Sequence, residues 1–520
     1  MKKTLTLLSF LCLMVTGLFA QTLGIENVQR ATLRNSAAIR EGSEVKGYYF
    51  FYVSDKIDKR TYEYTLRITD NNLATLKDVK FTDSKYVQVL ESSFNGTDLI
   101  FLFYNEKERT FEYQTYGADG KKKFTYTREL SKKETKLLEL TYLADEEDTY
   151  KGLYPVEGQG FISNMPSRED KDFTFQVDFF STEKRKQWTY IPTEGAKKHV
   201  GDYLGTANGV VYMGVLEYGS KMDQKPDSYI IGLDMATGKK LFQNATDNGK
   251  YRYYPSSMNV VGGKAYIFGE YFDLNGNIIK DKSSGFAFLG IDEKGKIVSE
   301  KFNSWDLQLG KFLDVSSKGR IADFGYMYVH QIIQLADGDV YAIGEGWKKQ
   351  ASTLGIMSQV ASAAAGGGGR GMAAAIKIKI TDLIIIRFDK DFNVKGAQVY
   401  AKRDNPIELP QGVGLAAGPA LAKMIKYNYG GFDYAYSQVN KDRTAFSVCY
   451  EDYVKDKEND YKGQTFNSIS FEDGKFSQDM IRTKSKATSS VVMPAQQGKV
   501  LILEYFKKDK RLDAHFEKLN

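Results

Sequence analysis

Cysteine is almost absent from this chain, which has two in 520 residues. Cys12 lies in an apolar N-terminal leader, and Leu11 stands before it where a lipoprotein signal has a small residue, so we expect no lipid anchor. Once the leader is removed, Cys449 has no second cysteine with which to form an internal disulfide. Its place in the strand-like run AFSVCYEDY indicates a packed core thiol rather than a nucleophile.

Histidine and the common catalytic motifs are also scarce. His199, His330 and His515 are far apart in the sequence and show no metal-ligand spacing. No GxSxG or HExxH motif is present, and the glycine run from Gly366 lacks the Lys-Ser/Thr of a phosphate loop. An Asn-Gly turn explains the oxygen-rich run FDLNGNIIKD from Phe272 without a metal. We therefore predict no metal, no cofactor and no catalytic residue.

Long basic runs and long apolar runs are missing as well. The net charge of +6 is a small difference between 72 basic and 66 acidic residues, so we expect no nucleic-acid partner. Lys2 and Lys3, the apolar run 5–19 and Ala20 form the three parts of a signal peptide, which we expect to be cleaved after Ala20. No later run is long enough to span a membrane. The chain is predicted to be exported, either periplasmic or extracellular and associated with the outer membrane.

Aromatic residues are plentiful, with 35 Tyr and 32 Phe, and they occur in a repeated hairpin. The hairpin reads LRITDNNLATLKDVKF from Leu66, IIGLDMATGKKLFQ from Ile230 and FLGIDEKGKIVSEKF from Phe288. A period near 50 residues is typical of a β-propeller with four-stranded antiparallel blades. We predict an all-β fold of about eight blades, with seven as the alternative. The expected blades begin near residues 36, 85, 149, 201, 255, 328, 432 and 488.

The last expected blade lacks a fourth strand before the chain ends. The run IENVQRATLR from Ile25 can supply it, so that the N- and C-terminal strands pair and close the ring. Residues 21–520 are accordingly one propeller domain. Two runs interrupt its rhythm, at about 348–379 and about 403–429, and both are rich in Ala and Gly. Residues 352–365 could form a short helix in the first of them.

The predicted strand order places both insertions next to each other on one face of the ring. That face receives the loops between second and third strands and the links between blades, whereas the other face receives only short turns. Binding residues are concentrated in loops carried by a rigid scaffold. We therefore expect the ligand- or partner-binding residues to be His199, Tyr251, Arg252, Tyr253, Tyr254, Tyr326, Tyr328, His330, Arg370 and Met372.

The run GLDMATGKKLFQ from Gly232 resembles the repeat of the pyrroloquinoline-quinone-type propellers, which include quinone-dependent dehydrogenases and a non-enzymatic outer-membrane assembly factor. Those repeats carry a tryptophan where Leu241 or Phe242 stands here, and the dehydrogenases carry an adjacent cysteine pair. The resemblance implies a propeller and no quinone chemistry. As a whole, the chain is similar to an uncharacterised family of exported Gram-negative propeller-like proteins.

These observations favour a monomeric binding or scaffold module for a protein or a glycan at the cell envelope, rather than an enzyme. The alternative is an exported carbohydrate-active hydrolase or lyase that uses the same face. An enzyme should show converging carboxylates or a His–carboxylate pair in the central funnel. A binding module should show aromatic and apolar surface instead.

Overall fold

The computed structural model describes most of the chain. The described residues run from 22 to 519, except for 42–43, 142–150, 170–171, 184, 193–197, 220–224, 262–263, 351–375, 410–416, 429, 457–460, 484 and 497. Two of the predicted binding residues, Arg370 and Met372, and the predicted helix at 352–365 lie outside them.

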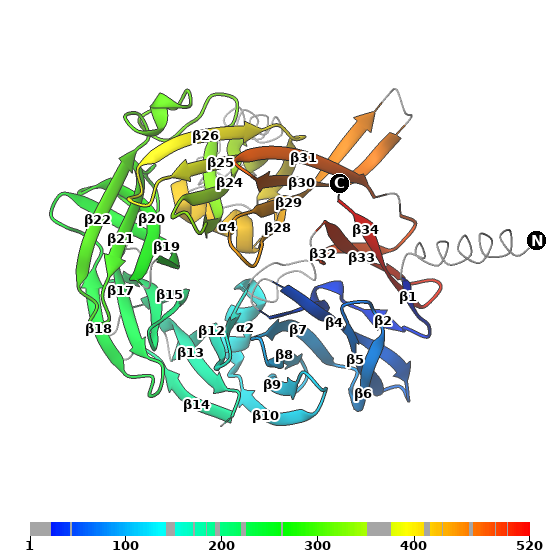
Figure 1. Cartoon of the computed structure of the whole chain (residues 1–520). Coiled ribbons are helices and arrows are strands. Elements are labelled where there is room, and N and C mark those ends of the chain that lie inside the picture. Colours follow the sequence, from blue (N-terminus) through cyan, green and yellow to red (C-terminus); the bar gives the residue numbers. More distant parts are fainter. Residues whose placement is uncertain are drawn as a thin grey trace, which may run out of the picture.

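Eight antiparallel sheets are arranged in a ring, which confirms the predicted propeller and settles the blade count at eight rather than seven (Figure 1). In every blade the first strand lies at the centre and the fourth at the rim. We number the blades along the chain, and each blade starts within a few residues of its predicted position. Blade 1 also holds the short strand β2 (Arg30–Ala31) against β4.

Blade 1 consists of β3 (Ala37–Glu41), β4 (Glu44–Lys56), β5 (Thr61–Asp70) and β6 (Thr75–Ser84), and blade 2 consists of β7 (Val87–Phe94), β8 (Asp98–Asn105), β9 (Thr110–Gly117) and β10 (Lys122–Glu129). Blade 3 consists of β11 (Leu153–Val156), β12 (Gly160–Glu169), β13 (Asp172–Ser181) and β14 (Arg185–Tyr190), and blade 4 consists of β15 (Lys198–Ala207), β16 (Val210–Tyr218), β17 (Asp227–Asp234) and β18 (Lys240–Ala245).

Blade 5 consists of β19 (Tyr251–Val261), β20 (Lys264–Asp273), β21 (Gly285–Ile291) and β22 (Ile297–Ser304). Blade 6 consists of β23 (Tyr326–Gln334), β24 (Val340–Gln350), β25 (Ile376–Phe388) and β26 (Val394–Tyr400), with β27 (Asn405–Leu409) added to β25. Blade 7 consists of β28 (Tyr434–Val439), β29 (Phe446–Asp456), β30 (Tyr461–Glu472) and β31 (Lys475–Arg482), and blade 8 consists of β32 (Ser489–Pro494), β33 (Lys499–Phe506), β34 (Arg511–Lys518) and the N-terminal strand β1 (Thr22–Ile25).

The position of a strand in its blade follows from its sequence pattern. The second strands are packed on both faces by neighbouring blades, so they are nearly continuous apolar runs, as in DLIFLFYN of β8. The fourth strands face solvent, so exposed and partly buried residues tend to alternate, as in KFSQDMIR of β31. This difference is why the apolar second strands were visible in the sequence.

A main apolar cluster fills the space between each pair of neighbouring blades, and a second, small one joins blades 4 and 5. Tyr49, Leu66 and Phe101 belong to the large cluster between blades 1 and 2. The cluster between blades 7 and 8 is the smallest of the eight among the described residues, with Cys449, Phe466, Val500 and Ile502 as its buried members. Cys449 is therefore a packed core thiol, and burial raises its pKa to about 12.

The ring closes through pairing of the two chain ends, as predicted. The N-terminal strand β1 runs antiparallel to β34, with Thr22 opposite His515 and Ile25 opposite Leu512. The closing strand lies slightly before the expected run and overlaps it only at Ile25. The rest of that run turns away, and Arg30 and Ala31 pair with β4 of blade 1 instead. One chain segment thus joins blade 8 to blade 1.

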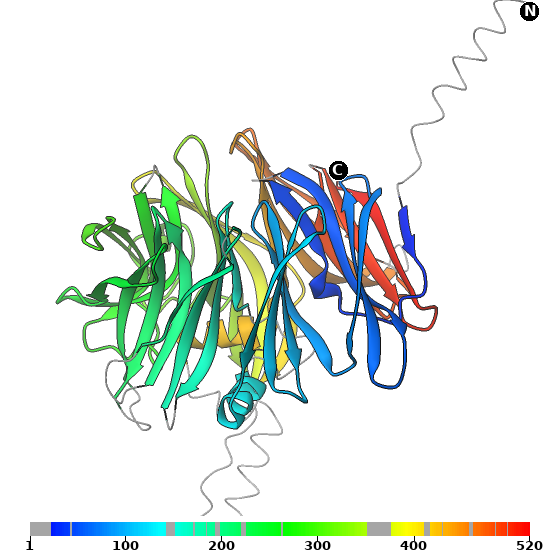
Figure 2. The ribbon, with the colours of Figure 1, turned by 90° about the horizontal axis from the view of Figure 1, so that it is seen from below.

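The two faces of the ring differ in their connections. The links between blades and the loops between second and third strands lie on one face, which we call the loop-rich face; the tight turns lie on the other, the short-turn face. The loop-rich face carries helix α2 (Lys132–Thr141), helix α4 (Gly418–Asn428) and the 3-10 helix η2 (Leu309–Lys311), while η1 (Leu33–Asn35) precedes blade 1. Figure 2 shows α2 at the lower edge of the ring, opposite the edge where the chain ends.

The helix-capped centre of the loop-rich face

Helix α4 lies beside the inner strands near the centre of the ring (Figure 1). The run GPALAKMIKYN is rich in good helix formers, and Pro419 stands in the first turn, where it is tolerated. Leu421 and Ile425 are one turn apart and fully buried, and they form one cluster with Trp347 of β24 and Leu409 of β27. This packing fixes the helix to blade 6.

Charged and phenolic groups tie the same helix to blades 4 and 5. Lys423 forms an ion pair with Asp202 of β15. The positive charge of Lys423 also interacts with the hydroxyl group of Tyr254 in β19. Burial lowers the pKa of Lys423, but Asp202 and the phenolic groups outweigh this and raise it above its ordinary value, so the ion pair persists at neutral pH.

Two of the predicted residues, Tyr254 and Tyr328, occupy equivalent places in this arrangement. Tyr254 lies opposite Glu270, and Tyr328 lies opposite Glu345, on the second strands of blades 5 and 6. A side-chain hydrogen bond joins Tyr328 to Tyr427 of α4. Burial raises the pKa of both strand tyrosines well above the ordinary value, so they remain protonated hydroxyls that face the helix.

A buried network of charged groups lies next to the helix. Glu345 accepts hydrogen bonds from the backbone amides of Asp433 and Tyr434, each at 3.1 Å. Its carboxylate lies 3.0 Å from Lys402 Nζ, and Lys402 also pairs with Asp433. The side chains of Glu345 and Lys402 have no exposed surface. Because an unpaired buried charge is very costly, these groups depend on one another.

His330 completes the network and is electrically neutral. Its Nε2 lies 3.2 Å from Glu345 Oε2, and its ring stacks on Tyr434 with 4.4 Å between the ring centres. Burial, followed by the charges of Lys426 and Lys402, lowers its pKa well below the ordinary value. The neutral imidazole therefore donates to Glu345 through Nε2–H. Among the described residues, its Nδ1 finds no hydrogen-bond partner.

Burial also raises the pKa values of the two acids. The pKa of Glu345 is raised despite the nearby Lys402, and that of Asp433 is raised to about 6. For Lys402, burial acts to lower the pKa, but the attraction of Glu345 and Asp433 prevails and raises it. Asp433 therefore loses its negative charge as the pH falls through about 6, and burial shifts the pKa of Glu345 in the same direction.

A glutamate in blade 2 accepts hydrogen bonds from two consecutive backbone amides, as Glu345 does. The carboxylate of Glu91 accepts hydrogen bonds from the consecutive amides of Gly152 and Leu153, at 2.9 and 3.0 Å. In both cases a glutamate holds the amides at the start of the next blade's inner strand. This repetition indicates that Glu345 is an inter-blade clamp, so the His330–Glu345 pair has a structural role.

His199 lies in β15 of blade 4, and Arg252 lies in β19 of blade 5. His199 Nε2 is 3.3 Å from Glu217 Oε2. Arg252 donates to the carbonyl oxygens of Gly276 and Pro226 and lines a cavity of about 390 Å³ together with Glu217 and Asp227. Both predicted residues therefore lie near Glu217.

The remaining predicted tyrosines are packed against neighbouring strands. Tyr253 is buried between blades 4 and 5, where its hydroxyl donates to Ile267 O at 2.7 Å. Tyr251 packs on Tyr271 and Phe302 of the same blade. Tyr326 packs on Trp347, with Lys282 Nζ 4.7 Å from its ring centre. The structure thus gathers Tyr254, Tyr328 and His330 around α4, and Tyr326 packs against the same apolar cluster as Leu421 and Ile425 of that helix.

The family model described as a family of unknown function, DUF6770, matches residues 1–520. The chain belongs to this family. That membership confirms the resemblance to an uncharacterised propeller family. No curated protein matches the chain.

Several solved structures are similar in fold. A quinohemoprotein alcohol dehydrogenase from Pseudomonas putida shares 11% identity, covers 93% of this chain and 75% of its own, and has a TM-score of 0.42. Prolyl oligopeptidase B from Galerina marginata, at 9% identity, covers 92% of this chain and 57% of its own, with a TM-score of 0.39. A putative dipeptidyl aminopeptidase IV from Bacteroides ovatus, at 12% identity, covers 64% and 47%, with a TM-score of 0.32.

Sequence reasoning missed the charged members of the site, namely Asp202, Glu345, Lys402 and Asp433. One signal was present: GKAYIFGEYF and GDVYAIGEGW place Glu270 and Glu345 in otherwise apolar second strands. A carboxylate in such a strand is seldom buried unless it is paired. The partners could not have been found, because they come from links whose path depends on the fold.

Proposed function

We propose that this chain is an exported cell-envelope module that binds or scaffolds a protein or glycan partner through its loop-rich face. Export rests on the N-terminal signal pattern, with cleavage expected after Ala20. Among the described residues, no helix is long and apolar enough to cross a membrane.

One observation carries the proposal. Ile376 of β25 pairs with Leu409 of β27, so the described ends of the two insertions lie on strands that are hydrogen-bonded to each other. The same link carries α4. Binding residues are usually concentrated in loops carried by a rigid scaffold.

Exposed apolar side chains on neighbouring loops support a protein partner. Leu274 is 39% exposed, Leu307 is 66% exposed and Phe312 is 41% exposed. Leu274 lies between β20 and β21, and Leu307 and Phe312 lie in the link from blade 5 to blade 6. A surface ion pair connects the two loops, with Lys318 Nζ 3.7 Å from Asp273 Oδ2. Apolar anchors with a polar surround are typical of protein interfaces.

A second candidate function, an exported carbohydrate-active hydrolase or lyase, is favoured by one feature of the same face. Glu217 and Asp227 lie directly opposite each other on β16 and β17 and line the same cavity as Arg252. Paired carboxylates are the usual acid–base groups of glycoside cleavage. The buried His330–Glu345 pair offers no such support, because neither side chain is exposed.

The test is a pull-down from envelope extract with three forms of the mature chain. The first is intact. In the second, residues 352–375 are replaced by Asn-Gly, which preserves the β24–β25 hairpin because Gln350 pairs with Lys377. The third carries Lys390→Glu on the short-turn face as a control. Circular dichroism must first show that all three are folded.

The proposal expects a partner that the intact chain and the control retain and that the shortened chain loses. Equal retention by all three forms would contradict it. A Glu217→Gln variant separates the two functions, since it should leave partner binding unchanged. If a screen finds glycan cleavage by the intact chain and not by this variant, the second candidate replaces the first.

A further inference from the structure

A cavity of about 600 Å³ lies on the opposite, short-turn face, between blades 7 and 8 and the edge of blade 1. It is independent of the loop-rich face. Most of its lining residues come from the first-to-second-strand turns of three blades and from the facing sides of β29 to β33, among them Ser447, Ser470 and Ser477. Cavities of this size accommodate small organic ligands.

The cavity arises from the sequence of blade 7. Cys449 packs against Val500 and Ile502 of blade 8, so the side of the sheet that carries Cys449 faces that blade. Ser447 lies two residues before Cys449 on the same side, and Ser470 and Ser477 continue its row across the sheet. In the corresponding strands of blade 1, the side facing blade 2 carries Tyr49, Phe51, Leu66 and Ile68. Because serine side chains are smaller than these four, they leave part of the space between blades 7 and 8 unfilled.

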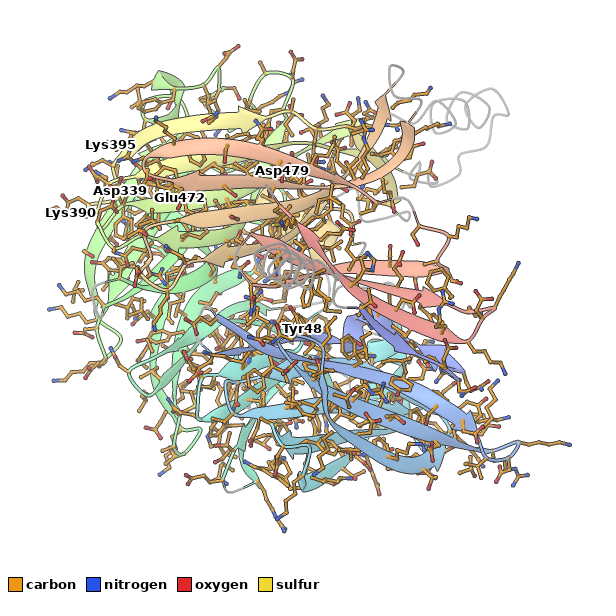
Figure 3. All side chains as sticks on the ribbon, turned by 45° about the vertical axis from the view of Figure 1, so that its right-hand side comes forward. Tyr48, Asp339, Lys390, Lys395, Glu472 and Asp479 are labelled. Atoms are coloured by element: carbon orange, nitrogen blue, oxygen red, sulfur yellow. The ribbon has the colours of Figure 1, made fainter. Side chains whose placement is uncertain are left out.

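The same rows are polar as well as small. Ser468 is paired with Cys449 on one side and with Asp479 on the other, and Asp479 is labelled on blade 7 in Figure 3. Ser447 and Ser470 share a hydrogen bond of 2.8 Å between their hydroxyl oxygens. A shared bond uses one of the two hydroxyl hydrogens, so the pair can still donate one hydrogen bond and accept others.

Charged side chains surround the mouth of the cavity. Lys46, Lys441 and Lys499 belong to blades 1, 7 and 8 and meet at its rim with Glu44 and Glu472. Glu44 pairs with Lys46 at 2.5 Å and lies 4.0 Å from Lys441. Glu472, also labelled in Figure 3, is exposed at the end of β30. Glu41 also pairs with Lys46, at 3.5 Å, so three cations meet three anions at the rim. Because Glu41 and Glu44 both pair with Lys46, the ammonium groups of Lys441 and Lys499 are the ones placed to meet a ligand above walls of hydroxyl and amide groups.

We propose that this cleft binds a short acidic oligosaccharide. Ammonium groups at the rim pair with the ligand's carboxylates. The serine hydroxyls and the side-chain amide of Gln496, which also lines the cavity, provide the donors and acceptors that sugar hydroxyls require. Gln438 already donates to Ala495 O at 3.0 Å, which fixes the floor between the two blades.

The experiment uses the mature full chain and isothermal titration calorimetry with three probes: trigalacturonate, its neutral counterpart galactotriose, and the sugar-free tricarboxylate tricarballylate. The double variant Lys441→Gln with Lys499→Gln removes two rim charges. The variant Ser470→Leu fills the wall of the cleft. Lys390→Gln is the matched control, since Lys390 is an exposed lysine in a turn of blade 6 on the same face (Figure 3).

We expect saturable binding of trigalacturonate, weaker by about tenfold or more in the double variant, as loss of charged hydrogen bonds implies. Ser470→Leu should abolish binding while the circular dichroism spectrum stays unchanged, and Lys390→Gln should bind normally. The proposal is overturned if trigalacturonate does not bind, if the two cleft variants bind it as tightly as the control, or if galactotriose or tricarballylate binds equally well.

Discussion

Lys402 Nζ lies 3.0 Å from Glu345 Oε1 inside the loop-rich end of blade 6, and neither side chain has any exposed surface. Lys402 belongs to the link that leads from blade 6 into β27 and α4, whereas Glu345 belongs to the second strand of blade 6 and holds two amides at the start of blade 7. This pair therefore joins two blades and the segment that carries the capping helix.

Replacement of Lys402 by Met should destabilise the protein strongly. It leaves Glu345 and Asp433 buried without their cation, and breaking a buried pair in this way costs about 3–5 kcal/mol. The measurement is urea unfolding at pH 7. Lys395→Met is the control, because Lys395 forms only a surface pair with Asp389, at 3.3 Å, and such pairs contribute about 0–1 kcal/mol. Equal losses for the two variants would show that the network does not hold the blades.

Glu270 should make the protein less stable as the pH rises. Burial raises its pKa from 4.5 to about 7. Between these values the folded state holds a proton that the unfolded state has lost, so the free energy of unfolding falls as pH increases. The shift corresponds to about 3 kcal/mol. Glu270→Gln should remove this contribution to the slope of the unfolding free energy against pH, measured by urea unfolding between pH 4.5 and 7. An unchanged slope would contradict the raised pKa of Glu270.

The sequence predicted the architecture well because its signals are local. Alternating and continuous apolar runs, separated by turns such as Asn208-Gly209 and Asp337-Gly338, mark strands and hairpins without reference to distant residues. Strand order alone predicted which face of the ring carries Tyr254, Tyr328 and His330. The ion pairs of Asp202 with Lys423 and of Glu345 with Lys402 connect residues far apart in the chain, and no periodic pattern marks them.

The interface between blades 7 and 8 should open more readily than the others. Its buried cluster has four members, whereas that between blades 1 and 2 has twelve. Less buried apolar surface means a smaller free energy for local opening. Native-state hydrogen exchange should therefore show lower protection for the central amides of β29 and β33 than for those of β4 and β8. Equal protection in all four strands would rule out a weak interface.

The N-terminal strand should be needed for a soluble, closed ring. A chain that begins at Asn27 lacks β1, which exposes the edge of β34 and removes the buried side chain of Ile25. Loss of such a side chain costs about 2 kcal/mol or more, and an open edge promotes association. Calorimetry and size-exclusion chromatography should show a lower Tm and aggregation relative to a chain that begins at Gln21. Identical behaviour of the two chains would mean that β1 does not close the ring.

The most direct test of the loop-rich face is hydrogen exchange of the intact mature chain with and without the partner captured from envelope extract. The account predicts slower exchange in the inter-blade links at 246–250, 305–325 and 417–433, with no change in the short turns at 71–74, 440–445 and 473–474. Protection confined to the short turns would contradict it, because the partner would then occupy the opposite face.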